Sequence, residues 1–466
     1  MSLSSIDIFH VLAAIAALIA IAHAGGLLAM RLGLPAMVGE LAGGLLLGPT
    51  FFARIFPNAF DWLFSPAHGV HSAGGSVHPV LPILGIISQL GLFFLMFLGG
   101  LQLRQLMTRR DTRAIAWIAS LGVAVPVAAG ILILLIWDFS KYMGPAESGR
   151  ALNIILITAL AVTSIPVITR VFMDLGLMES RLARIVLTVA VLEDVLLYVA
   201  ISIAIGIADS QSKSDASIPT HIGLDPNSVW FIVWHITASL VLLVLSTRVV
   251  RFHRDWSTRS RNPIVIRSPL GWTIASMFGV ILVAQLLGLA PMFGALLAGI
   301  ASSGDRRPDF VSARQQIEAF SQGFFIPIYF ALIGLQLDLV SDLDLAFAAG
   351  LLIVGTVVKY TGALIGARIA GEPKAMAHSL AISVNARGGP GIVLATTALS
   401  AGIINQQAFT GLIILAIATS VAAGSWLAHI VRAHPNALRL IIGAEHTPDE
   451  ARGDLPQPPA AGTTIS

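Results

Sequence analysis

Residues 182–208 read LARIVLTVAVLEDVLLYVAISIAIGIA, an apolar run that contains two adjacent acids, Glu193 and Asp194. A helix that crosses a membrane needs about 20 mostly apolar residues, and this run is long enough. The two acids lie near its middle, at the depth where a charge is most unfavourable. The stretch therefore predicts a membrane-spanning helix that carries ionisable groups at its centre.

The rest of the chain shares this apolar character. Of its 466 residues, 56% are hydrophobic and 11% are charged, whereas a soluble domain carries about 25% charged residues. Mean hydropathy is +0.84 and cysteine is absent. This composition excludes a soluble enzyme, a disordered chain, a disulfide scaffold, a thiolate metal site and a cysteine nucleophile. The net charge of +3 is too small to indicate nucleic-acid binding, so we expect a multi-pass membrane protein.

Apolar windows of about 20 residues predict an all-α membrane protein with about 13 transmembrane helices. The expected spans are about 7–30, 35–51, 81–103, 114–136, 151–171, 182–208, 229–247, 270–288, 290–303, 319–337, 345–367, 376–400 and 409–431. Because no Lys or Arg precedes Arg31, a cleaved signal peptide would lack its basic start, and we expect the first span to be retained. Residues 433–466 are expected to form a short tail.

The basic residues indicate the orientation of these spans. If the N-terminus lies outside, 22 of the 28 Lys and Arg residues fall on the inner side. The basic residues that fall outside are Arg54, Lys141, Arg150 and Lys213. Since cytoplasmic loops are enriched in Lys and Arg, we expect the N-terminus outside and the C-terminal tail in the cytoplasm. The location would be a cell membrane, namely the inner membrane of a bacterium.

Two parts of the chain resemble each other. The third span ends with Gly-Leu-Gln-Leu at residues 100–103, and the tenth ends with the same four residues at 334–337. The second and ninth spans open with Pro35 and Pro291, each followed by a segment rich in glycine and leucine. Both matches imply a shift of seven helices, and an odd shift inverts the second copy in the membrane. The sequence therefore predicts an inverted structural repeat, which is typical of secondary transporters.

The same shift pairs span 5 with span 12, and both spans are interrupted. Span 5 contains Thr-Ser-Ile-Pro at residues 163–166, and span 12 contains Asn-Ala-Arg-Gly-Gly-Pro-Gly at 385–391. Pro166 and Pro390 lack a backbone donor, and Gly388 and Gly389 loosen a helix. A break in a membrane helix is tolerated where its free backbone groups find partners or line a wet cavity. The alternative is a pair of ordinary proline kinks, but matched breaks in two halves point to a transport site.

Four ionisable groups lie near the middle of the membrane: Glu193, Asp194, Lys359 and Arg387. Adjacent residues on a helix point about 100° apart, so the two acids cannot share one contact. We expect one acid to pair with Lys359 and the other to face a cavity, where a proton and a small cation compete for it. With alternating access, such competition suffices for cation/proton antiport. The alternative is a structural ion pair, which leaves the second acid unexplained.

Several stretches resemble the monovalent cation:proton antiporter superfamily, in its Kef-like branch with the sodium/hydrogen exchanger domain. They are residues 38–49, Thr163-Ser164, Glu193-Asp194, 333–338, Lys359 and 385–388. The resemblance implies one transmembrane domain over residues 1–432, which forms a homodimer in the lipid membrane. Its core would comprise residues of about 114–208 and 345–431, its scaffold about 7–103 and 270–337, and a linker helix about 229–247. Spans 5 and 12 would cross at their breaks beside span 6, and the core would move as an elevator.

The resemblance also implies roles for individual residues. Those implied to bind the ion or the proton are Asp194, Glu193, Thr163 and Ser164. Those implied to compensate charge are Lys359 and Arg387, and Lys359 is implied to pair with Glu193, the acid that precedes the ion-binding aspartate. The position before the ion-binding aspartate is often Asp in electrogenic members and Asn in electroneutral ones, and Glu193 is longer than the usual Asp. No cofactor is expected, and no metal beyond the transported cation.

The residues leave several functions open. The expected partners are protons and a monovalent cation, and both Na+ and K+ remain candidates. A proton-coupled exporter of an organic ion or metabolite could use the same fold. A cation channel would conduct without proton coupling, and the paired broken helices argue against it. An intramembrane enzyme would need a catalytic group of residues, but the chain has no His-Glu-x-x-His motif and no phosphate-binding loop.

Overall fold

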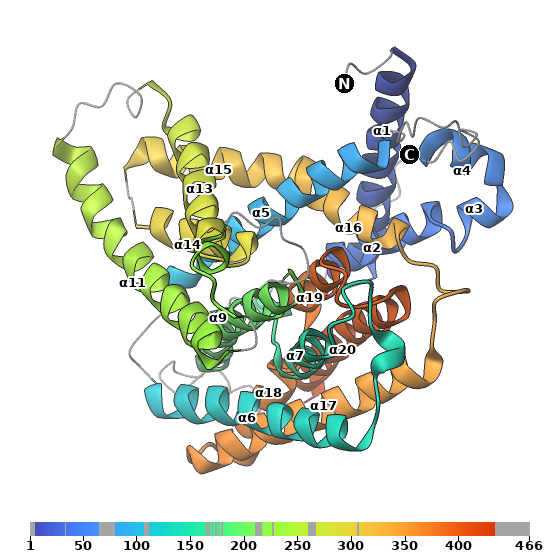
Figure 1. Cartoon of the computed structure of the whole chain (residues 1–466). Coiled ribbons are helices and arrows are strands. Elements are labelled where there is room, and N and C mark those ends of the chain that lie inside the picture. The colour runs from blue at the N-terminus through green and yellow to red at the C-terminus, as the bar shows by residue number, and fades with distance from the viewer. Residues whose placement is uncertain are drawn as a thin grey trace, which may run out of the picture.

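The computed structural model describes residues 5–32, 34–64, 80–106, 111–164, 168–169, 171–172, 175, 177–178, 180–209, 217–225, 228–259, 267–304 and 307–433. The helices of the first half (Figure 1) are α1 (Ser5–Arg31), α2 (Ala36–Leu47), α3 (Phe52–Ile55), α4 (Pro57–Phe64), α5 (Val80–Leu106), α6 (Thr112–Ile136), η1 (Ser140–Tyr142), α7 (Gly149–Ala161) and α9 (Arg181–Asp209). Those of the second half are α10 (Ile218–His221), α11 (Val229–Arg259), α13 (Pro269–Leu286), α14 (Pro291–Ser302), α15 (Pro308–Phe320), η2 (Ser321–Phe325), α16 (Ile326–Leu335), α17 (Leu345–Ile369), α18 (Lys374–Ser383), α19 (Gly388–Ser400) and α20 (Gln406–Ala433).

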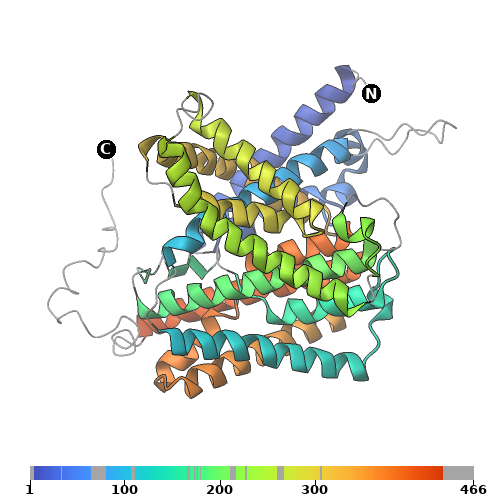
Figure 2. The same cartoon turned by 60° about the vertical axis from the view of Figure 1, so that its left-hand side comes forward.

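The helices pack in pairs that are far apart in the sequence. In Figures 1 and 2, α6 and α17 run side by side along one edge of the molecule. The expected repeat relates α2 to α14 and α5 to α16, and the contacts match it: α2 packs against α16, and α14 packs against α5. The repeat also relates α1 to α13, and α1 packs against α2 as α13 packs against α14. Glycine permits such close approach: a Cβ at Gly44 on α2 would collide with the backbone carbonyl of Ala331 on α16. The buried centre is formed by α7, α9, α18, α19 and α20.

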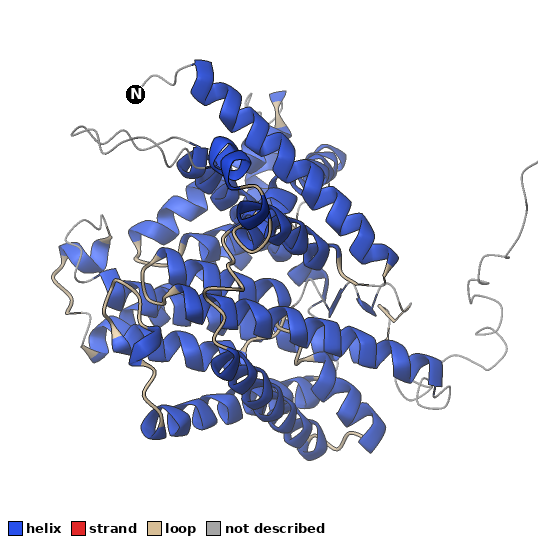
Figure 3. Ribbon diagram, turned by 90° about the vertical axis from the view of Figure 1, so that its right-hand side faces the viewer, coloured by secondary structure: helices blue, strands red, loops and turns tan. Residues whose placement is uncertain are grey.

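The expected all-α membrane fold is confirmed: the regular elements of the described ranges are helices (Figure 3). By length and composition, ten helices among the described residues can cross a membrane, and Gly149–Ala161 and Pro291–Ser302 are shorter apolar helices. Each of the thirteen expected ranges contains helix, while the number of crossings stays a prediction. Two helical segments extend far beyond their expected ranges. Helix α11 continues to Arg259, and α15 joins α16 through the π-helical turn η2, which no sequence signal had indicated.

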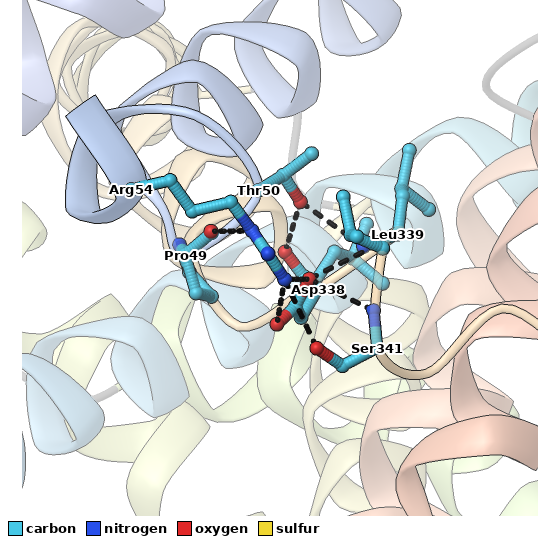
Figure 4. A network of polar contacts seen from close by, with 8 residues as sticks. Pro49, Thr50, Arg54, Asp338, Leu339 and Ser341 are labelled. Carbon is cyan, nitrogen blue, oxygen red and sulfur yellow. Dashed lines mark hydrogen bonds and ion pairs between the residues drawn. The ribbon is translucent and has the colours of Figure 1, made fainter.

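The link between α16 and α17 begins at a polar network (Figure 4). Arg54, from the short helix α3, donates to both carboxylate oxygens of Asp338, at 3.1 and 3.2 Å, and to Ser341 Oγ at 3.0 Å. The hydroxyl of Thr50 donates to Leu337 O at 2.8 Å and accepts from Leu339 N at 3.1 Å. These contacts fix the end of α16 to the segment that follows α2.

The same link ends at a second acid. Asp344 caps the N-terminus of α17, because its Oδ1 accepts from Phe347 N at 3.1 Å. Its Oδ2 accepts from Lys141 Nζ at 2.8 Å and from Tyr142 OH at 3.0 Å. The hydrogen bonds from Lys141, from Phe347 N and from Tyr142, together with the charge of Lys141, lower the pKa of Asp344 to about 2. The link is therefore held at Asp338 by the α2–α3 segment and at Asp344 by the segment between α6 and α7.

Candidate functional site

The two expected breaks are present in the structure and contact each other. Helix α7 ends at Ala161, and Val162–Ser164 follow without helical structure, while residues 384–387 separate α18 from α19. Ser164 N donates to Ala386 O at 2.6 Å, and the Thr163 hydroxyl donates to Val384 O. Thr163 and Ser164 are fully buried. Pro166, which the sequence places in the first break, lies outside the described residues.

The second break leads directly into the first turn of α19. Gly388, with a φ of 28°, adopts a backbone conformation that side chains rarely allow, and it begins the helix. Gly389 and Pro390 follow within the first turn, where the backbone N–H groups of a helix have no internal acceptor. Pro390 therefore sacrifices no helical hydrogen bond, and the proline starts the second half-helix rather than kinking a continuous one.

The C-terminal end of α7 receives donors from two cationic side chains. Arg387 Nε donates to Ala159 O at 3.0 Å, and its Nη2 donates to Leu160 O at 2.9 Å. Lys359 Nζ donates to Ala161 O. The last carbonyls of a helix have no partners within it and carry partial negative charge. These two side chains therefore supply the hydrogen-bond donors that allow α7 to end inside an apolar region.

Two hydroxyl groups on α20 serve the opposite kind of helix end. Ser420 Oγ accepts from Gly388 N at 2.9 Å, and Thr419 Oγ1 accepts from Arg387 N at 3.4 Å. Both hydroxyls also donate to carbonyls one turn back on α20, so the proton of each hydroxyl is engaged within α20. The sequence reasoning missed these residues, although two adjacent hydroxyls in an otherwise apolar span are a usable signal.

Lys359 forms a buried ion pair with the first acid of the pair on α9. Its Nζ lies 2.7 Å from Glu193 Oε1, and the two side chains are 0% and 1% exposed. Lys359 also donates to Gly122 O on α6, at 3.0 Å. Gly122 leaves room for the acid, since a Cβ there would lie only 3.2 Å from Glu193 Oε1. Of the two acids that could have paired with Lys359, the structure selects Glu193.

Asp194 is the second acid, and its surroundings differ from those of Glu193. It is 4% exposed, and its Oδ1 has no hydrogen-bond partner among the described residues. The buried hydroxyl of Ser164, in the first break, is likewise without a partner among the residues that the structure describes. One turn further along α9, the fully buried Tyr198 donates to Met96 Sδ at 2.6 Å. A buried carboxylate without donors is unfavourable as an anion, so Asp194 is suited to bind a proton or a cation.

Within the described ranges, no three His, Asp or Glu side chains gather as a metal site. The predicted residues that the structure brings together at the breaks and at the acid pair are Thr163, Ser164, Glu193, Asp194, Lys359 and Arg387. Glu40, on α2, does not belong to this group. It lies half-buried where α2 packs against α1.

The sequence of this chain matches a known protein family. The model of the family described as "Sodium/hydrogen exchanger, transmembrane" matches residues 14–433. The Na(+)/H(+) antiporter NhaS4 of Synechocystis sp. is 25% identical over 415 residues, which cover 88% of this chain and 94% of that protein. The Na(+)/H(+)-K(+) antiporter GerN of Bacillus cereus is 24% identical over 418 residues, with coverages of 89% and 94%.

Two further similarities concern length and fold. Cation/H(+) antiporter 20 of Arabidopsis thaliana is 24% identical over 403 residues, and this chain spans 44% of its length. The structure of the sodium proton antiporter MjNhaP1 from Methanocaldococcus jannaschii is similar with a TM-score of 0.63 at 13% identity. That similarity covers 93% of this chain and 99% of the other, and it shows a shared fold. Since the family match extends over nearly the whole sequence, the chain belongs to the sodium/hydrogen exchanger family.

Proposed function

We propose that this chain is a secondary active antiporter that exchanges a monovalent cation, Na+ or K+, for protons. The observation that carries the proposal is Asp194, a buried carboxylate whose Oδ1 has no hydrogen-bond partner among the described residues. Its neighbour Glu193 is already paired with Lys359. A proton and a cation compete for one carboxylate, so binding of either releases the other. The names of the relatives NhaS4 and GerN, which are Na+/H+ and Na+/H+-K+ antiporters, agree with this exchange.

We further propose that the two contacting breaks form the mobile part of the transporter. In this proposal the core comprises residues of about 114–208 and 345–431, and it moves as an elevator against a scaffold of about 7–103 and 270–337. The contact of α6 with α17 and the burial of α9 between the broken helices support a core that moves as one unit. A homodimer, an outside N-terminus and a cytoplasmic C-terminus complete the proposal.

The test is a pH-gradient assay in proteoliposomes. An acid-inside gradient is imposed, and NaCl, KCl or LiCl is added outside while a pH-sensitive dye is recorded. We expect Na+ or K+ to dissipate the gradient for the wild type and for the control Asp342→Asn, an acid in the α16–α17 link. Asp194→Asn should abolish the response. Wild-type exchange by Asp194→Asn rejects the site, and a wild type that responds to none of the three cations rejects the substrate class.

A second measurement addresses the stoichiometry. If the Glu193–Lys359 pair takes up a second proton on one side of the membrane and releases it on the other, two protons exchange for one monovalent cation. Exchange then moves net charge, and its rate depends on an imposed membrane voltage. A voltage-independent rate would leave Glu193 and Lys359 as a structural pair. Cation conductance without coupled proton movement would instead identify a channel.

A further inference from the structure

An apolar cavity of about 250 Å³ lies between α6, α7 and α17, and we name it the α6–α17 cavity. None of the described residues that line it is charged. Its buried floor is formed by Gly130, Leu156, Leu160 and Phe347, and Trp137 and Gly350 are exposed at its mouth. An apolar cavity of about 150 Å³ is large enough to bind benzene, so this one can hold a longer apolar group.

The α6–α17 cavity lies next to one membrane surface. The last two turns of α6 expose apolar side chains, as expected for a helix that faces lipid: Ile131, Leu132, Leu135 and Ile136. Trp137, which is 68% exposed, follows them, and tryptophan is enriched where the membrane meets water. From Gly130 to Trp137 the chain rises about 10 Å along α6. Since the hydrocarbon layer is about 30 Å thick, the cavity occupies the outer third of that layer on this side.

A second cavity, of about 340 Å³, adjoins the first at this surface, and Leu134, Trp137 and Phe139 line both. We name it the rim cavity. Its lining includes the exposed side chains of Asp138 and Asn153. Oδ1 and Oδ2 of Asp138 accept from Ser140 N and Ser140 Oγ, each at 2.8 Å, and these hydrogen bonds lower the pKa of the carboxyl.

The rim cavity therefore presents an ionised carboxylate next to an exposed tryptophan. Asp138 forms no ion pair with any basic side chain among the described residues. A carboxylate hydrogen-bonds an ammonium group strongly, and a tryptophan ring attracts the same cation through its face. An anionic group would instead be repelled by Asp138.

We propose that the two cavities bind one phospholipid with an ammonium headgroup. One acyl chain fills the α6–α17 cavity, and the ammonium contacts Asp138 in the rim cavity. An acyl chain gains little hydrophobic free energy here, because the bilayer that it leaves is equally apolar. The charge of the headgroup therefore supplies the selectivity. This inference depends on the membrane fold and not on the proposed antiport.

The direct test is photolabelling in vesicles of phosphatidylglycerol. Phosphatidylethanolamine and phosphatidylglycerol probes carry a diazirine in the upper part of one acyl chain, and mass spectrometry locates the labelled residues. Leu156 and Leu160 are each 5% exposed, so lipid in the surrounding bilayer does not reach them. The phosphatidylethanolamine probe should label them about twofold to fivefold more than the other probe, as expected for one exposed ion pair. Equal labelling by both probes, or none at these leucines, would overturn the site.

Gly350→Leu tests the position of the acyl chain. A Cβ at Gly350 would lie in open space, so the variant should fold, and its side chain occupies the mouth of the α6–α17 cavity. Gly279→Leu on α13 is the matched control, because that glycine is also exposed and a Cβ there would meet no neighbour. We expect Gly350→Leu to abolish labelling of Leu156 and Leu160, and the control to label as the wild type does. Wild-type labelling of Gly350→Leu would overturn the site.

Asp138→Asn tests the headgroup and leaves the α6–α17 cavity unchanged. Labelling of Leu156 and Leu160 by phosphatidylethanolamine should fall to the level of phosphatidylglycerol. Asp61→Asn is the control, because Asp61 precedes the exposed Trp62 but lines neither cavity. A preference for phosphatidylethanolamine that survives in Asp138→Asn, or that is lost equally in Asp61→Asn, would overturn the role of Asp138 and with it the site.

Discussion

Replacement of Arg387 by methionine tests whether this side chain holds the end of α7 within the membrane. The substitution keeps most of the apolar stem and removes the charge and every donor. It leaves the carbonyl groups of Ala159 and Leu160 without their partners. It also releases Gly355 O and Asn385 Oδ1, each of which accepts from the guanidinium at 2.7 Å.

The expected loss of stability follows from counting these contacts. The guanidinium donates five hydrogen bonds in all, the fifth to Asn385 O at 3.2 Å. Hydrogen bonds in membrane bundles average about 0.6 kcal/mol each, so five give about 3 kcal/mol. Arg387→Lys keeps the charge near the end of α7, but one nitrogen cannot reproduce the planar fork, so we expect it to retain about half of this value.

The assay is unfolding of the purified protein in mixed micelles by titration with SDS. Arg368→Met is the matched control, because that guanidinium donates to the backbone carbonyl of Glu372 at 3.0 Å near the end of α17. We expect the control to lose less than about 1 kcal/mol. If Arg387→Met and Arg368→Met lose equal free energies of unfolding, the assignment of Arg387 as the cap of α7 is wrong.

Three other perturbations test separate features. Lys359→Met leaves the buried Glu193 unpaired and should lower the free energy of unfolding by about 3–5 kcal/mol. Adding Glu193→Gln to this variant should restore part of the lost stability. Additive losses in a double-mutant cycle would contradict the ion pair. Gly44→Val should prevent the close packing of α2 on α16 and give aggregated protein in size-exclusion chromatography, and a monodisperse, stable variant would refute that contact. Lys141→Ala should lower the melting temperature at pH 5–7. The folded pKa of Asp344 is about 2, below its ordinary value of about 4, so the stabilisation by the ionised carboxylate is present above pH 4. The difference in melting temperature from the wild type should vanish as the pH falls through 2. A difference that persisted at low pH would contradict the Lys141–Asp344 interaction.

The sequence predicted the centre of the site because charges in a membrane need partners. Only a few ionisable groups lie at that depth, so pairing Lys359 with one acid of 193–194 required no knowledge of the fold. The matched positions of residues 163–166 and 385–391 indicated two broken helices, and the family resemblance implied that they cross at their breaks. The choice of Glu193 over Asp194 was implied by the family resemblance alone. The residues by themselves leave it open, because it depends on how α9 is rotated relative to α17 and α6.

Other features left weaker traces in the sequence. Arg387 was expected to compensate charge, and the structure shows that its donors reach carbonyl and amide oxygens at the end of α7 and around the second break. That role depends on the distance between two half-helices, which no local pattern encodes. The hydroxyls of Thr419 and Ser420 and the π-helical turn at Ser321–Phe325 likewise gain meaning only from their tertiary neighbours.

The anchored link between α16 and α17 has a mechanical consequence. Asp338 is held by Arg54 and Asp344 by Lys141, and six residue steps separate the two acids. A fully extended chain spans at most about 3.3–3.6 Å per residue, so this tether reaches about 20 Å. While both ion pairs persist, the α2–α3 segment and the start of α17 cannot travel further apart than that. The length of this segment, rather than any side chain within it, then limits how far one half of the molecule can move relative to the other.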